Sequence, residues 1–136
     1  MQLDFFGPGA RLHHVGYAVP SIERVAPGLQ RFEDPIQRVA VAFLDLNGLP
    51  VELVEPLGED SPVRRLLTQR QNIYHSCFTV PDLEAAIAHA GERGVACIRT
   101  PVPAVAFEGR RIAWLLHPAF GLFELLEEQR QPGTPC

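Results

Sequence analysis

Two histidines in an internal repeat are the residues of this chain best placed to do chemistry. They are His14 and His75, which lie 61 positions apart in LHHVGYAVPSIE and IYHSCFTVPDLE. Each stretch reads as a strand with a central histidine, followed by a proline and the start of a helix. An isolated histidine on an apolar strand is more often a hydrogen-bonded core residue, but matched repetition favours a shared role as metal ligands.

Two glutamates repeat in step with the histidines. Glu52 lies in VELV near the end of the apolar stretch VAFLDLNGLPVELVE, and Glu124 lies in FELL near the end of IAWLLHPAFGLFELLE, each flanked by apolar residues. A buried carboxylate costs several kcal/mol unless it is paired or binds a cation. Two imidazoles and two carboxylates suit one divalent ion such as Zn, Co, Ni, Mn or Fe. We therefore predict a metal site formed by His14, Glu52, His75 and Glu124.

Strand alternation predicts where this site lies. His14 shares a face with Gly16, and His75 shares one with Cys77, so the histidine faces carry small side chains and leave room for a cavity. The same alternation puts His13 on the opposite face, with a structural or surface role. We expect His89 to be solvated on its helix and His117 to be a turn residue that could line the pocket mouth.

Bulk composition favours a small intracellular globular protein. The 136 residues predict a single domain, and the net charge of −4 with scattered arginines argues against a nucleic-acid partner. Three cysteines suit a reducing compartment, and no membrane-length apolar run or signal peptide is visible. We expect a cytoplasmic protein without a membrane partner that acts on a small-molecule substrate.

The order of predicted elements is β-α-β-β-β, seen twice. Module one spans about 11–56, a linker helix lies within about 57–71, module two spans about 72–128, and 129–136 is expected to be a disordered tail. The predicted class is α+β, with an eight-stranded curved sheet and helices outside. Pro27 and Gly28 shorten the first helix, and DLEAAIAHAGERG predicts the clearest one. Strands are predicted at 12–19, 37–45, 49–55, 95–100, 111–116 and 121–127, and from about 73.

These motifs resemble the glyoxalase, or vicinal oxygen chelate, superfamily. HHVGYAV, VAFLDLNGLPVELVEPLGEDSPV, YHSCFTVPDLEAAI, GERGV and WLLHP followed by GLFELLE are most similar to methylmalonyl-CoA epimerases. The resemblance implies a cupped sheet around a metal ion, with the same four residues at the ligand positions. It also implies proton removal beside a thioester carbonyl, an enolate intermediate, and reprotonation on the other face.

Departures from the epimerase pattern leave alternatives open. Val41 occupies a position where some epimerases carry a glutamate base. Either Glu52 or Glu124 then acts as both ligand and proton acceptor, or the activity has changed. Ala119 and Phe120 replace a basic residue and favour a smaller or more apolar substrate than a coenzyme A ester.

Three functions are compatible with the pattern. The first is a metal-dependent isomerase or lyase, and the second is a non-catalytic small-molecule binding protein on the same fold. An Fe(II) dioxygenase ranks last, because a fourth ligand blocks the open facial triad. We also expect a homodimer, with residues 1–11 contributing to the contact or covering the pocket.

Overall fold

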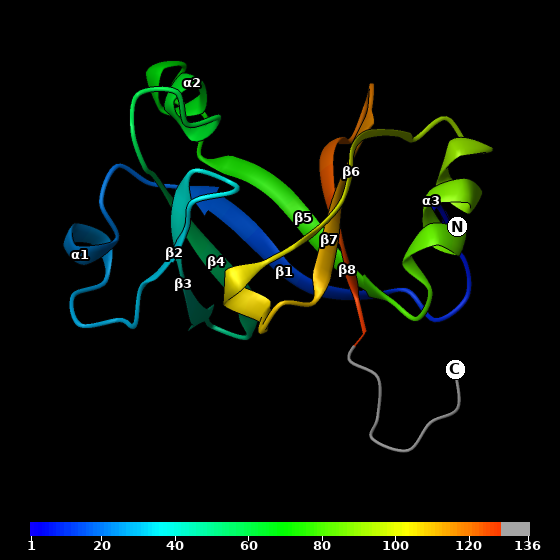
Figure 1. Ribbon diagram of the computed structural model, residues 1–136, viewed down its shortest axis with the longest axis horizontal. Helices are drawn as coiled ribbons and strands as arrows, with labels where there is room; N and C mark the ends of the chain where they lie inside the picture. The colour runs from blue at the N-terminus through cyan, green and yellow to red at the C-terminus, as the bar shows by residue number, and fades with distance from the viewer. Residues whose placement is uncertain (129–136) are drawn as a thin grey trace.

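The computed structural model describes residues 1–128 and shows one strongly curved sheet of eight strands (Figure 1). The strand order is β2-β3-β4-β1-β5-β8-β7-β6. The predicted α+β class is therefore confirmed, whereas the predicted tail at 129–136 lies outside the described residues. The strands are β1 (Arg11–Ala18), β2 (Phe32–Asp34), β3 (Val39–Leu46), β4 (Leu49–Pro56), β5 (Ile73–Val80), β6 (Ala96–Pro103), β7 (Arg111–His117) and β8 (Gly121–Glu127).

The sheet consists of two similar halves joined between β1 and β5. In module one β1 pairs in parallel with β4, and in module two β5 pairs in parallel with β8, while β1 and β5 are antiparallel. The repeat in the sequence is thus a repeat in the sheet. The helices are α1 (Ile22–Val25), α2 (Val63–Thr68), α3 (Leu83–Gly91) and the 3₁₀ turn η1 (Val105–Phe107).

Equivalent residues begin the helix of each module. The side chain of Ser21 accepts a hydrogen bond from the Arg24 amide at 3.3 Å, and that of Asp82 accepts one from the Ala85 amide at 3.0 Å. Both satisfy a free N–H of the first turn. The helices then differ, since α1 has four residues and α3 has nine. Helix α1 ends at Val25, before Pro27 and Gly28, in agreement with the predicted short first helix.

The β1–β5 ladder contains two bulges at equivalent places. Leu12 pairs with Phe78 and His14 with Cys77, so His13 is an extra residue on β1. A bulge places two residues opposite one and interrupts the side-chain alternation.

The second bulge lies on the other strand of the same ladder. Gly16 pairs with His75 and Tyr17 with Ile73, so Tyr74 is the extra residue on β5. Each bulged residue directly precedes a predicted metal ligand. The bulges therefore shape the part of the sheet on which both histidines stand.

Helix α3 and the N-terminal arm, residues 1–10, cover the outer face of module two (Figure 1). Phe6 is buried there and its ring centroid lies 5.2 Å from that of Phe78 and 5.1 Å from that of Phe123. His89 is half-buried beside the arm, with Nε2 3.9 Å from Asp4, so the prediction that it is solvated was wrong. The arm lies outside the cup.

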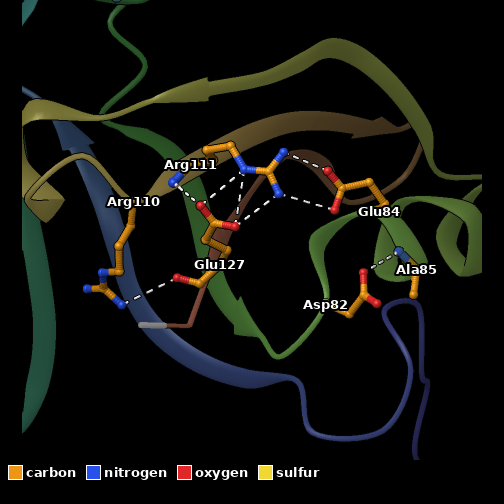
Figure 2. A network of polar contacts seen from close by, with 6 residues as sticks. All are labelled: Asp82, Glu84, Ala85, Arg110, Arg111 and Glu127. Carbon is orange, nitrogen blue, oxygen red and sulfur yellow. Dashed lines mark hydrogen bonds and ion pairs between the residues drawn. The ribbon is translucent and has the colours of Figure 1, made fainter. Parts of the chain in front are cut away.

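A polar network joins α3 to β7 and β8 near the surface (Figure 2). The Arg111 guanidinium donates to Glu84 at 2.6 Å and to Glu127 at 3.0 Å. Arg111 lowers the pKa of Glu84, and it lowers that of Glu127 against the opposing effect of burial. In residues 1–128 no helix is long and apolar enough to span a membrane.

Candidate metal centre

The four predicted ligands come from the four adjacent central strands β4, β1, β5 and β8. All four side chains are buried and lie within 4.8 Å of one another. The Nε2 atoms of His14 and His75 are 3.1 Å apart. Oε1 of Glu52 lies 3.6 and 3.5 Å from these nitrogens, and Oε1 of Glu124 lies 3.3 and 3.4 Å from them.

These separations fit a single divalent cation. Donors that each lie about 2.1 Å from one ion are roughly 3.0 to 3.5 Å apart. Oε1 of Glu124 is buried without a hydrogen-bond partner among the described residues, as expected of an atom whose partner is a cation. Two carboxylates and two neutral imidazoles would also balance a charge of +2. The residues therefore fit the implied metal.

The two buried carboxylates of the cluster favour a positive charge between the four side chains. Burial lowers the pKa of His14, but the nearby carboxylates of Glu124 and Glu52 outweigh burial and raise that pKa to about 9. Burial likewise raises the pKa of Glu124, while His14 and His75 hold it well below its ordinary range. Two buried carboxylates thus face the same point and attract either protons or a cation.

The floor beneath each histidine comes from the opposite strand. A Cβ added to Gly16 would lie 2.2 Å from Cε1 of His75, so only glycine fits under that ring. The equivalent place under His14 is taken by Cys77, which is fully buried. Burial and Glu124 raise the pKa of the Cys77 thiol, which keeps it protonated.

Aromatic side chains surround His75. Its ring centroid lies 4.9 Å from that of Trp114 at 90° and 5.0 Å from that of Tyr74 at 85°. Trp114 Nε1 donates to Gln37 Oε1 at 3.0 Å, which leaves the buried Gln37 Nε2 without a partner among the described residues. Of these, sequence reasoning missed Tyr74, Trp114 and Gln37, although Tyr74 occupies the repeat position of His13.

The space beside the ligands is smaller than predicted. A cavity of about 30 Å³ borders Glu52, His75 and Glu124, because Phe107 and Trp114 fill the cup. Val41 lies in its apolar wall and is buried. The small floor residues leave less room than expected because η1 folds over the opening.

A wider hollow of about 430 Å³ lies beside this cavity. It runs between α2 and the β7–β8 hairpin and is bordered by Tyr74 and His75. Arg65 is the only cationic residue among those that line it. His117 does not line it: its Nδ1 accepts from the Ala119 amide at 3.0 Å, as predicted for a turn residue.

The position of His13 corrects a prediction. We placed it on the face opposite His14, but its Nδ1 lies 2.8 Å from Nδ1 of His14 and its ring lies 5.6 Å from that of Phe107. The prediction failed because strict alternation does not hold at a bulge.

Comparison with known proteins agrees with this geometry. Residues 13–114 match the Glyoxalase/Bleomycin resistance protein/Dioxygenase superfamily. The chain therefore belongs to the glyoxalase, or vicinal oxygen chelate, superfamily.

Within the superfamily the chain is similar to epimerases of acyl-CoA thioesters. It is 31% identical to an ethylmalonyl-CoA/methylmalonyl-CoA epimerase from Cereibacter sphaeroides over 79% of this chain and 88% of the relative. The methylmalonyl-CoA epimerase structure from Mycobacterium tuberculosis has 25% identity and a TM-score of 0.72, covering 96% of this chain and 94% of its own. A Streptomyces coelicolor epimerase in complex with 2-nitronate-propionyl-CoA has 27% identity and a TM-score of 0.68, covering 87% and 94%.

Proposed function

We propose that this protein is a metal-dependent isomerase or lyase, similar to methylmalonyl-CoA epimerase, that acts on an acyl-thioester or a related carbonyl substrate. The observation that carries the proposal is the convergence of His14, Glu52, His75 and Glu124 in one buried cluster. The named relatives support the choice of reaction, since those proteins are epimerases.

These four residues would hold a divalent cation, which would supply Lewis-acid stabilisation of the negative charge that develops on the substrate carbonyl oxygen. The chain itself has to hold and move the proton. Glu52 and Glu124 each direct Oε1 at the histidines, which leaves the second carboxylate oxygen of each as a proton acceptor. One carboxylate would remove the proton beside the carbonyl, and the other, in its protonated form, would deliver a proton to the opposite face of the enolate.

The walls of the cup keep water away from the carbanion. Val41, Val54 and Ile112 line the cavity with apolar groups. Burial and the charges of Glu124 and Glu52 raise the pKa of Tyr74 to about 12, so its hydroxyl stays protonated at neutral pH. The body of a substrate would lie in the wider hollow beside Arg65, because the inner cavity has room for little more than the reacting atoms.

The test is exchange of solvent deuterium into candidate acyl-thioesters. Wild-type protein loaded with Co²⁺ should incorporate label at the carbon beside the carbonyl, and Glu124→Gln should abolish incorporation. Glu127→Gln removes a surface carboxylate three residues later and should exchange at the wild-type rate. Exchange by Glu124→Gln at the wild-type rate would contradict the assigned role of Glu124.

A second candidate is a non-catalytic binding protein on the same fold. The observation that favours it is the apolar Val41 in the wall of a cavity of about 30 Å³. Apart from the proposed metal ligands, Asp34 is the one carboxylate among the residues that line this cavity. Tight binding of a small molecule without label exchange would support this function instead.

We also propose that the protein is a cytoplasmic homodimer. Edge strand β6 exposes Ile98, whose residue surface is 57% accessible, and unpaired apolar edges favour association. Light scattering after size exclusion would give the mass of the particle, and a monomer at micromolar concentration would contradict the proposal.

A further inference from the structure

The bulge on β1 turns His13 toward the cup, where its ring meets that of His14. The ring centroids are 5.1 Å apart at 78°, and the two Nδ1 atoms are 2.8 Å apart. We propose that His13 is a positioning residue for the metal ligand His14: Nδ1 of His13 accepts a hydrogen bond from Nδ1–H of His14. This inference rests on the metal centre proposed above.

The direction of the hydrogen bond follows from the use of the other nitrogen. His14 Nε2 faces His75, Glu52 and Glu124, so its lone pair is available to a cation only when the proton is on Nδ1. Nδ1 of His14 is then a donor, and Nδ1 of His13 must be the acceptor. His13 therefore carries its own proton on Nε2.

The acceptor is held in place by its surroundings. His13 packs edge-on against Phe107 at 5.6 Å and 87°, and Phe107 stacks on His14 at 6.0 Å and 23°. The bulge fixes the backbone of His13 beside its neighbour. The rings of His13 and Phe107 thus hold one orientation of the His14 imidazole, which is what a metal ligand requires from its hydrogen-bond partner.

Module two has no equivalent hydrogen bond among the described residues. Tyr74 occupies the repeat position of His13, but Nδ1 of His75 is buried without a partner in residues 1–128. His75 is instead confined by Trp114 and by the backbone of Gly16. The hydrogen bond to the ligand imidazole is specific to module one, so a substitution at His13 should affect His14 and leave His75 unchanged.

The experiment measures Co²⁺ affinity of the full chain by competition with a chelator, together with the visible spectrum of the bound Co²⁺. His13→Phe keeps a ring but removes the acceptor, and it should weaken binding about 10- to 100-fold, the usual effect of losing such a partner. His13→Asn places an oxygen acceptor near the position of Nδ1 and should restore affinity to within a few-fold of wild type. His89→Phe makes the same exchange on α3 and should bind as wild type does.

A readout of the tautomers separates positioning from packing. Two-bond ¹H–¹⁵N spectra of the Zn²⁺-loaded protein should show His14 protonated on Nδ1 and His13 on Nε2. The reverse assignment, or equal affinity of wild type and His13→Phe, would overturn the proposal while leaving the metal centre intact.

Two further outcomes are decisive. Two metal ions per chain, one of them lost in His13→Phe, would make His13 a ligand with His14 and Cys77 and would overturn a positioning role. Failure of the wild-type protein to bind Co²⁺ would overturn the metal centre itself, and the role of His13 with it. If His13→Phe does not fold, the test rests on His13→Asn. A folded His13→Asn that loses the wild-type affinity or spectrum also overturns the proposal.

Discussion

The two modules present the same histidine in the same place, but they fix it by different means. In module one, His14 stands above Cys77 and its far nitrogen lies 2.8 Å from His13. In module two, His75 stands above Gly16, and its far nitrogen is buried without a partner among the described residues. The repeat preserves the strand and the bulge, whereas each module has its own support for the ring.

This difference shows which part of the site tolerates change. A hydrogen bond can be replaced by another acceptor, so the support of His14 depends on chemistry. The His75 ring is supported sterically, because it packs against Gly16 where a side chain with a Cβ would not fit. The two halves of the site should therefore respond differently to small substitutions.

The largest effect is expected from Gly16→Ala. The new Cβ would lie 2.2 Å from Cε1 of His75, so the ring must move away from the cluster. Losing the support of a metal ligand costs about 10- to 100-fold in affinity, and we expect a loss of Co²⁺ affinity at the upper end of that range because the ring itself is displaced. Competition titration measures it.

The matched change in module one is Cys77→Ala, which removes volume under His14 instead of adding it. It should weaken Co²⁺ binding much less than Gly16→Ala does. Equal affinity of Gly16→Ala and wild type would show that the floor under His75 does not position the ring.

Metal removal should have the next largest effect. A ligand at 100 times its dissociation constant stabilises the folded state by about 2.7 kcal/mol, so a chelator should lower the free energy of unfolding by that amount. The difference should persist in His13→Asn and vanish in Gly16→Ala. Denaturant titrations with and without Co²⁺ measure it, and identical curves for wild type would oppose a metal in the folded core.

Helix capping offers a smaller contrast between the modules. Asp82→Ala should destabilise the protein by about 1 kcal/mol, because α3 loses a cap and covers the outer core of module two. Ser21→Ala should cost less, since α1 has only four residues to lose. Urea unfolding of the two variants gives the comparison, and a larger loss for Ser21→Ala would contradict it.

The smallest effect is expected at the surface network of module two (Figure 2). Arg111→Ala should cost less than about 1 kcal/mol near neutral pH, because its ion pairs are exposed and screened by salt. The pKa values of Glu84 and Glu127 are lowered in the folded state, so this contribution is present above the ordinary carboxyl range and is lost as the pH falls. Wild type and variant should therefore converge in stability at acid pH, and a gap that widens there would refute the assignment.

The sequence was informative where the repeat and the hydrophobic pattern coincide. The four buried donors, the long helix α3 and most strands were predicted at or near their observed positions. Strand β2 was not located, because Phe32–Asp34 is too short to show alternation and follows a loop with Pro27 and Gly28. Its existence followed only from the repeat.

The missed parts of the site depend on irregular backbone or on distant segments. A bulge leaves no mark in the sequence, so His13 was assigned to the wrong face. The contact between Trp114 and Gln37 joins residues 77 positions apart, and no local pattern predicts it. The closing of the cup by Phe107 likewise depends on where η1 folds.

The most direct test of the account is the diffraction of crystals soaked with Co²⁺, recorded at the metal absorption edge. We predict one anomalous peak per chain, within about 2.3 Å of Nε2 of His14 and His75 and of a carboxylate oxygen of Glu52 and Glu124. No peak between those four side chains, or a peak held by only one module, would contradict a metal centre built from both halves of the repeat.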